Sequence, residues 1–190
     1  MLNIVLFGPP GAGKGTQSEK IIEKYQLTHI STGDLFRKHL GEGTDLGKQA
    51  KKFMDEGNLV PDSLVIDMVE DKIKATPDTH GYIFDGFPRT VAQAEALDGL
   101  MDKIGDAING MIALEVPEKE LKKRIKLRAL TSGRVDDQDE SKIDNRIRVY
   151  QDETLPVAKY YEGQNKFHSI NGVGTIDEIF TQIVKEVDLL

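Results

Sequence analysis

The chain has 190 residues, of which 25 are Lys or Arg and 32 are Asp or Glu, so its net charge is −7. This length allows one domain with a sizeable core, and the negative charge disfavours a nucleic acid partner unless a local basic patch binds it. The sequence contains no cysteine, which excludes disulfides and thiolate zinc sites, and we expect neither a signal peptide nor a membrane-spanning segment. We therefore expect a cytoplasmic enzyme that acts on small molecules, with no membrane or nucleic acid partner.

The first predicted element is a buried strand over Leu2–Phe7, which runs directly into a glycine-rich loop, Gly8–Thr16. The next stretch, Gln17–Tyr25, has the pattern of a helix. In such a unit the glycines let backbone N–H groups converge on an anion, the helix N-terminus adds partial positive charge, and Lys14 supplies a mobile cation. The unit predicts a site for a nucleoside polyphosphate, in preference to a glycine-rich turn that binds nothing.

The loop follows the Walker A pattern Gly8-x4-Gly13-Lys14 with one departure. Gly15 occupies the position after the lysine, where Ser or Thr is usual, and Thr16 comes one place late. This departure indicates a particular branch of phosphate-loop enzymes.

A second apolar run, Thr28–Ile30, precedes a stretch that breaks the alternation of strands and helices. Ser31–Val60 contains two short helical patterns with no strand between them, interrupted at Gly41–Gly43 and ended by Gly57-Asn58 before Pro61. We expect a helical insertion here, because Gly and Pro mark the ends of both patterns.

The third predicted strand, Tyr82–Phe84, ends at Asp85. A carboxylate at the end of a hydrophobic strand is typical of a Walker B element, which holds Mg²⁺ directly or through water beside the phosphates. Arg89 follows, where the carboxyl edge of a parallel sheet meets a cleft, and its planar guanidinium suits bidentate phosphate contacts. Each residue alone also fits a polar strand end or a surface arginine, but together with the phosphate loop they favour a phosphate site.

The remaining predicted strands are Met111–Val116 and Lys166–Ile170. Between them, Glu118–Arg128 is rich in charge but has the spacing of an amphipathic helix, and the polar segment Ala129–Asp137 predicts a mobile loop or lid. Apolar runs that alternate with helical stretches predict an α/β fold with a five-stranded parallel sheet covered by helices on both faces.

Four segments, in this order along the chain, resemble the adenylate kinase family: Gly8–Thr16, Ser31–Asp34 with Arg37, Asp85–Thr90 with Gln93, and Ser132–Asp137. In that family the glycine after the lysine is the expected form. The resemblance covers the whole chain and implies a single P-loop kinase domain, expected to be a monomer. It implies a core over 1–30, 61–126 and 138–190, a helical monophosphate-binding arm over 31–60, and a short lid over 127–137.

The reaction implied by this resemblance is reversible transfer of the terminal phosphate of Mg-ATP to AMP, giving two ADP and so supplying ADP and balancing the adenine nucleotides. The transfer is in line and needs no covalent intermediate with the enzyme. Mg²⁺ is the implied cofactor, and Asp85 is its implied site, through water.

The family's functional residues carry over to positions that match its motifs. The implied ATP-binding residues are Gly11, Ala12, Gly13, Lys14, Gly15, Thr16, Arg124, Arg128 and, in the loop Gly172–Thr175 beside the donor base, Gly174. The implied AMP-binding residues are Thr32, Arg37, Asn58, Leu59, Val60, Gly86, Phe87, Pro88, Arg89, Gln93, Arg134 and Arg146. The implied catalytic residues are Lys14, Arg89, Arg128, Arg134 and Arg146.

Six of the seven arginines fall in these implied sites, and only Arg148 has no role. Between Asp137 and Arg146 the chain is one residue longer than expected for the family, and one residue rotates a helix by about 100°. Arg146 keeps its place if the extra residue precedes the helix, near Ser141. If the extra residue lies within the helix, Arg148 or Asn145 faces the cleft instead.

The lid implied here is the short, metal-free form, since many bacterial relatives hold zinc through four cysteines in a longer lid and this chain has none. The four histidines are scattered and receive no role: His29, His39, His80 and His168. No zinc is expected.

Two alternatives remain for the function. A uridylate/cytidylate kinase resembles an adenylate kinase in its loop and arginines, but it tends to have alanine where this chain has Thr32 and to lack the arrangement that contains Gln93. A GTPase switch would need an Asn-Lys-x-Asp guanine reader, whereas Asn165-Lys166 is followed by Phe167-His168. Both comparisons favour the adenylate kinase interpretation.

Overall fold

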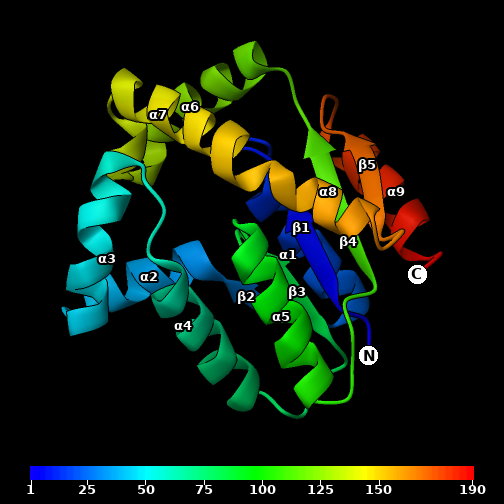
Figure 1. Cartoon of the computed structure of the whole chain (residues 1–190). Coiled ribbons are helices and arrows are strands. Elements are labelled where there is room, and N and C mark those ends of the chain that lie inside the picture. Colours follow the sequence, from blue (N-terminus) through cyan, green and yellow to red (C-terminus); the bar gives the residue numbers. More distant parts are fainter.

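The computed structural model describes residues 1–190, and a parallel sheet of five short strands forms its centre (Figure 1). The strands are β1 (Ile4–Phe7), β2 (Thr28–Ser31), β3 (Tyr82–Asp85), β4 (Gly110–Glu115) and β5 (Phe167–Asn171), in the order β2-β3-β1-β4-β5. Each strand lies within a run predicted from the sequence or extends it by one residue. The predicted five-stranded parallel sheet is therefore confirmed.

Helices connect successive strands and also form the inserted segments. They are α1 (Lys14–Tyr25), α2 (Thr32–Gly41), α3 (Asp45–Glu56), α4 (Asp62–Lys74), α5 (Val91–Lys103), α6 (Glu118–Ser132), α7 (Glu140–Val149), α8 (Pro156–Glu162) and α9 (Ile176–Val187). Two short turns complete the set, the 3-10 turn η1 (Val135–Asp137) and the π-helical turn η2 (Tyr150–Thr154). None of these helices combines the length and the apolar character needed to cross a membrane.

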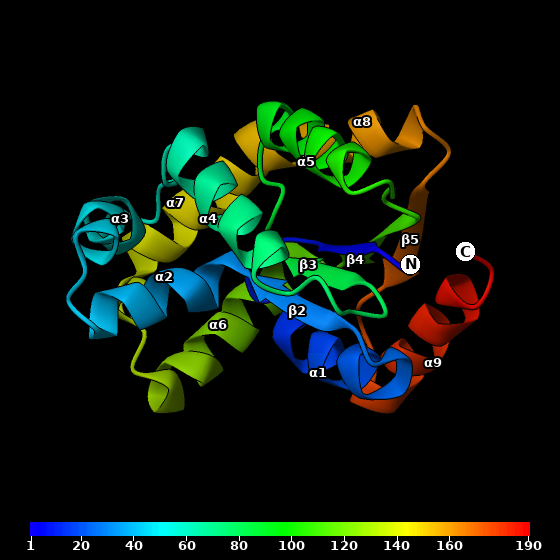
Figure 2. The ribbon, with the colours of Figure 1, turned by 90° about the horizontal axis from the view of Figure 1, so that it is seen from below.

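Alternate side chains of each strand enter two separate cores, because successive residues of a strand point to opposite faces of the sheet. On one face, Val5 and Phe84 pack with α4, α5 and α8, and on the other, Ile4 and Ile83 pack with α1 and α9. Figure 2 shows α5 and α8 on one side of the sheet and α1 and α9 on the other. Burial on both faces explains why the central strands β1, β3 and β4 are almost continuously apolar, whereas the edge strands β2 and β5 are partly exposed and contain more polar residues.

The predicted helical insertion consists of α2 and α3, which project from the carboxyl edge of the sheet (Figure 1). A side-chain hydroxyl caps the N-terminus of each helix: Ser31 accepts from the N–H of Asp34, and Thr44 accepts from the N–H of Gly47. At the end of α3, Gly57 adopts a left-handed conformation with φ 75°, which glycine tolerates best. The interruption and the end of the helical pattern were thus correctly placed from Gly and Pro.

The segment predicted as a polar loop from Ala129 to Asp137 is largely ordered as helix, which corrects that prediction. Helix α6 continues to Ser132, stops where Gly133 takes a left-handed conformation with φ 62°, and is followed after Arg134 by η1. Leu130 on this last turn is 80% exposed, so the helix continues without apolar burial there. The loop prediction is wrong because an exposed helical turn lacks the apolar periodicity by which a helix is recognised in a sequence.

Candidate active site

A cavity of about 580 Å³ opens at the carboxyl edge of the sheet. All the implied site residues except Gly174 line it: Gly11, Ala12, Gly13, Lys14, Gly15, Thr16, Thr32, Arg37, Asn58, Leu59, Val60, Asp85, Gly86, Phe87, Pro88, Arg89, Gln93, Arg124, Arg128, Arg134 and Arg146. They come from the loop after β1 and the start of α1, from the α2–α3 insertion and the residues after it, and from the end of β3 and the residues after it. Helices α5, α6 and α7 and the link between α6 and η1 supply the rest. Ligands of open α/β folds gather at this edge, so the topology brings the four sequence segments into one place.

Lys14 is the first residue of α1 and folds its side chain back over the loop. Its Nζ donates to the carbonyl oxygens of Gly8 at 2.7 Å and Pro9 at 3.2 Å. Burial lowers the pKa of Lys14 to about 8, although the charge of Asp85 opposes this shift. Asp85 therefore offsets the effect of burial on Lys14 only in part, and an entering anion would raise the pKa of Lys14 again.

Asp85 ends β3 directly beside the phosphate loop, because β3 pairs with β1 in the register Leu6 to Asp85. Its Oδ2 lies 3.8 Å from Nε2 of His29 on the neighbouring strand. Burial opposes the charge of Asp85, but His29 and Lys14 outweigh it and lower the pKa of the carboxyl. The site thus contains an ionised carboxylate oxygen, the ligand type that magnesium prefers. No group of three His, Asp or Glu side chains is placed to enclose a metal ion.

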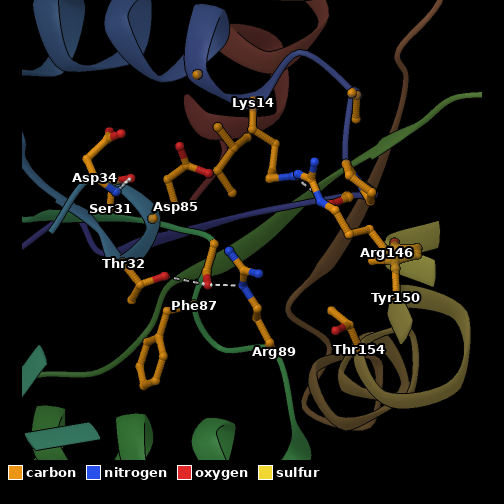
Figure 3. A pocket seen from close by; sticks show the side chains of 18 of the residues that line it. Lys14, Ser31, Thr32, Asp34, Asp85, Phe87, Arg89, Arg146, Tyr150 and Thr154 are labelled. Atoms are coloured by element: carbon orange, nitrogen blue, oxygen red, sulfur yellow. Dashed lines mark hydrogen bonds between the residues drawn. The ribbon is translucent and has the colours of Figure 1, made fainter. Parts of the chain in front are cut away.

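A second part of the cavity wall, formed by the residues after β3, is organised around the carbonyl oxygen of Gly86. Thr32 Oγ1 donates to that oxygen at 2.8 Å and Arg89 Nε donates to it at 2.7 Å (Figure 3). Gln93 fixes the same segment, because its Oε1 accepts from the N–H of Arg89 at 2.8 Å while its Nε2 donates to Asp62 at 2.7 Å. Both terminal nitrogens of Arg89 stay without protein partners and remain available to an anion.

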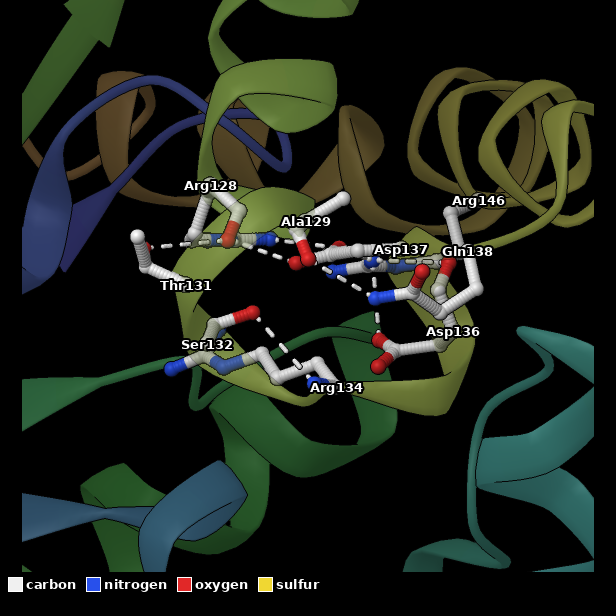
Figure 4. A network of polar contacts seen from close by, with 9 residues as sticks. All are labelled: Arg128, Ala129, Thr131, Ser132, Arg134, Asp136, Asp137, Gln138 and Arg146. Carbon is white, nitrogen blue, oxygen red and sulfur yellow. Dashed lines mark hydrogen bonds and ion pairs between the residues drawn. The ribbon is translucent and has the colours of Figure 1, made fainter.

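Two cavity arginines, Arg128 and Arg146, share the carboxylate of Asp137. Arg128 donates to Asp137 through Nε at 2.7 Å and Nη2 at 2.8 Å, and Arg146 donates to it through Nη1 at 2.7 Å (Figure 4). Asp136 lies 2.8 Å from the same nitrogen of Arg146. Burial opposes the charge of Asp137, but its bonds from Arg128 and the charge of Arg146 lower its pKa. Nη1 of Arg128 and Nη2 of Arg146 make no protein hydrogen bond, so both guanidinium groups are held while each keeps free donors.

The question left open by the extra residue has a clear answer in helix α7. Arg146 lines the cavity, whereas Arg148 is exposed and donates to Asn145. The helix begins at Glu140 after Asp139, which accepts from the N–H of Ser141. Of the three residues considered from sequence, Arg146 is the one that the helix turns toward the cleft.

Arg37 and Arg134 are two further arginines that line the cavity. Arg37 pairs with Asp34 three residues before it, while the Arg134 side chain has no hydrogen-bond partner in the protein. Burial and the nearby charges of Arg37 and Arg128 lower the pKa of Arg134. The cavity thus concentrates positive charge although the chain as a whole is acidic.

One implied residue lies outside the cavity, and several lining residues were not expected from the sequence. Gly174 does not line the cavity, although its loop is tied to it because Arg124 Nη2 donates to the Gly172 carbonyl at 3.0 Å. The unexpected lining residues include Asp136, Tyr150 and Thr154. Asp136 lies within a segment that the sequence did single out, whereas the π-helical turn that carries Tyr150 and Thr154 has no sequence signature.

Comparisons with known proteins agree with this arrangement. The family model described as adenylate kinase matches residues 6–166. Over 190 residues the chain is 52% identical to an adenylate kinase of Flavobacterium johnsoniae and 50% identical to one of Bacteroides fragilis, with all of both chains covered each time. An adenylate kinase of Syntrophobacter fumaroxidans is 44% identical over 208 aligned positions, covering 96% of this chain and 98% of that protein. The chain therefore belongs to the adenylate kinase family.

Proposed function

We propose that this adenylate kinase divides its cavity between two nucleotides and transfers the terminal phosphate of Mg-ATP to AMP, giving two ADP. The observation that carries the proposal is the pairing of two walls in one cavity. The phosphate loop with Lys14 forms one wall, Gly86–Gln93 with Thr32 forms the other, and guanidinium groups lie around both. A site for a single nucleotide would not need the second wall.

The donor half would consist of Gly11–Thr16, whose backbone N–H groups and helix N-terminus favour a polyphosphate. Arg124 and Arg128 from α6 line the same side. Arg124 also donates a hydrogen bond to the carbonyl of Gly172, which ties the loop around Gly174 to the donor half. We therefore propose that this loop binds the base of ATP. Contacts of that kind would be made by the backbone and by stacking.

Asp85 would hold magnesium through water, since its carboxylate is ionised and lies at the phosphate loop. When bound, the ion would neutralise negative charge on the phosphates. No zinc site is proposed.

The acceptor half would consist of Thr32, Arg37, the Asn58–Val60 backbone, and Gly86–Arg89 with Gln93. Arg37 and Arg89 are suited to the phosphate of AMP, because a guanidinium binds two phosphate oxygens at once. Thr32 and Gln93 are suited to distinguishing adenine, since both are already fixed by hydrogen bonds to the same segment. Their order before binding reduces the entropic cost of recognition.

During transfer, Arg128, Arg134 and Arg146 would stabilise the negative charge that spreads over the phosphoryl group between the two halves. No side-chain nucleophile is required, so the enzyme contributes position, charge and exclusion of water. We propose that the arm (31–60) and the lid (127–137) close over the nucleotides to exclude water, and that the enzyme acts as a cytoplasmic monomer.

A panel of nucleoside monophosphates tests the proposal. With Mg-ATP as donor, AMP should be phosphorylated faster than CMP, UMP or GMP, and ADP should form in a ratio of two per AMP consumed. Faster phosphorylation of CMP or UMP would overturn the assignment of the acceptor half.

Gln93→Ala sharpens the same test. This variant should lower the preference for AMP over CMP, because Gln93 lines the acceptor half. Gln164→Ala is the matched control, since Gln164 bonds to Asp98 away from the cavity. An unchanged preference in Gln93→Ala would remove Gln93 from base recognition.

A further inference from the structure

Arg148, the arginine without a role in nucleotide binding, belongs to a chain of hydrogen bonds that joins α7 to the end of α3. Its Nη2 donates to Oδ1 of Asn145 at 2.6 Å. The Asn145 amide then donates through Nδ2 to the carbonyl oxygen of Glu56 and to Oδ1 of Asn58, each at 2.9 Å. Residues nearly 90 positions apart in sequence are therefore held together by one side chain.

Asn145 donates to a backbone carbonyl that has no hydrogen-bond partner within its own helix. Glu56 is the last residue of α3, and the final carbonyls of a helix have no partner within it. An amide is suited to this position because it accepts from Arg148 while it donates twice to the arm. An aspartate could do only the first and an alanine neither.

The two helices also touch directly at this point. A Cβ atom on Gly57 would lie 2.7 Å from Cγ of Arg146 and 3.2 Å from the carbonyl oxygen of Lys142. The end of α3 therefore packs against the same turn of α7 that presents Arg146 to the cavity. The residues that follow Gly57 are Asn58, Leu59 and Val60, which line the cavity and belong to the proposed acceptor half.

We propose that Asn145 is a positioning residue for the acceptor nucleotide. Its amide holds the Gly57–Val60 segment in register with the helix that carries Arg146, and Arg148 fixes the orientation of that amide. Asn145 does not line the cavity, so it acts through the arm and not on the nucleotide. The inference rests on the proposed function, because it assumes that Asn58–Val60 binds AMP.

This role predicts a selective change in kinetics. Asn145→Ala should raise the KM for AMP by roughly three- to tenfold, the range expected for losing one or two ordinary hydrogen bonds. The kcat and the KM for ATP should stay near the values of the parent enzyme, because loss of an interaction present in both ground and transition states changes KM alone. Initial rates with each nucleotide varied at a saturating level of the other measure both constants.

Two further variants separate positioning from general loss of structure. Asn145→Asp keeps the size of the side chain and its acceptor for Arg148 but removes both donations to the arm, so it should raise the KM for AMP at least as much as Asn145→Ala. Asp144→Ala is the matched control on the same helix, since Asp144 pairs with Lys122 on α6 and not with the arm. It should leave both KM values unchanged.

A double-mutant cycle identifies the partner. Asn58→Ala removes one of the two acceptors, so the effects of Asn145→Ala and Asn58→Ala on the KM for AMP should be less than additive. An unchanged KM for AMP in Asn145→Ala, or equal rises in KM for AMP and ATP, would overturn the inference. If the parent enzyme itself failed to phosphorylate AMP, the proposed function would fall instead, and the two failures are thus distinguishable.

Discussion

The phosphate loop and the turn that contains Asp137 both hold cations at one cavity, but they hold them in different ways. Lys14 is held by main-chain carbonyls of its own loop, which lies between a buried strand and the helix that follows it. Arg128 and Arg146 are held by the carboxylate of Asp137, which lies in the 3-10 turn η1 after the end of α6. Backbone carbonyls thus hold Lys14 in place, whereas a side-chain carboxylate holds Arg128 and Arg146.

Replacing Lys14 should have the largest effect on activity and a small effect on the fold. Lys14→Met should reduce kcat/KM by at least about a thousandfold, because the variant loses charge stabilisation on the transferred phosphoryl group. The Tm should stay the same or rise, since a partly buried cation is removed while the backbone of the loop is unaffected. Steady-state kinetics with thermal unfolding checks both statements, and near-normal turnover would remove Lys14 from the phosphate site.

Replacing Asp137 should instead affect stability and activity together, which is the contrast between the two regions. The Asp137 side chain is fully buried, and Asp137→Asn would leave Arg128 and Arg146 without their shared anion. We expect a loss of about 1–3 kcal/mol in unfolding free energy and a drop in kcat of about 10- to 100-fold. Asp136→Asn should be milder in both respects, because Asp136 contacts Arg146 alone.

The pH dependence of this difference follows from the lowered pKa of Asp137. A carboxyl group whose pKa is lowered by folding stabilises the folded state above its unfolded pKa of about 4 and ceases to do so as the pH falls through the folded value. The Tm gap between the parent enzyme and Asp137→Asn should therefore be full at pH 7 and shrink below about pH 4. A gap that stayed constant down to pH 3 would contradict this account.

The same contrast explains which parts of the site could be predicted from sequence. The donor loop and the end of β3 are local, since Gly8–Thr16 and Asp85–Arg89 are continuous segments whose chemistry follows from strand–loop–helix order. The strand order β2-β3-β1-β4-β5 then brings these segments together at one edge of the sheet. The alternation of apolar runs and helical stretches predicts the parallel sheet, but it does not give the order of the strands.

The side-chain contacts around Asp137 and between α7 and the end of α3 could not be predicted, because each joins residues that lie far apart in the sequence. Nothing local in the sequence pairs Asp137 with Arg146, or Asn145 with Glu56. The orientation of α7 could not be settled by counting residues, because one position changes the helix face by about 100°. The polar turn at the end of α6 looked like a loop for the related reason that exposed helices lack an apolar pattern.

The environment of Lys14 should also affect how Mg-ATP binding depends on pH. Burial lowers the pKa of Lys14 to about 8, with Asp85 opposing the shift. Above that pH the free enzyme loses the proton, so binding of Mg-ATP should take one up and weaken as the pH rises from 7 to 9. Titration calorimetry in buffers of different ionisation enthalpy measures the uptake, and Lys14→Met should show none.

The lowered pKa of Lys14 should also make the free energy of unfolding rise as the pH rises from about 8 toward 10.5, since the unfolded chain binds more protons than the folded one in this range.

Gly15 offers the smallest and most specific comparison. A Cβ atom at this position would meet no protein atom within 4 Å, so the fold itself does not require the glycine. Because Gly15 lines the cavity in the first turn of α1, we infer that its missing side chain leaves room for phosphate. Gly15→Ala should leave the unfolding free energy unchanged or raise it by up to about 1 kcal/mol.

The affinity of Gly15→Ala for Mg-ATP should nevertheless fall several-fold, because the methyl group occupies space beside the phosphate loop. Gly99→Ala is the matched control: Gly99 lies within α5, also has open space at its Cβ position, and does not line the cavity. It should gain similar stability and bind Mg-ATP as the parent does. Equal ATP affinity in the two variants would mean that Gly15 is not kept for the ligand, and that the loop is prepared by Lys14 and the backbone N–H groups alone.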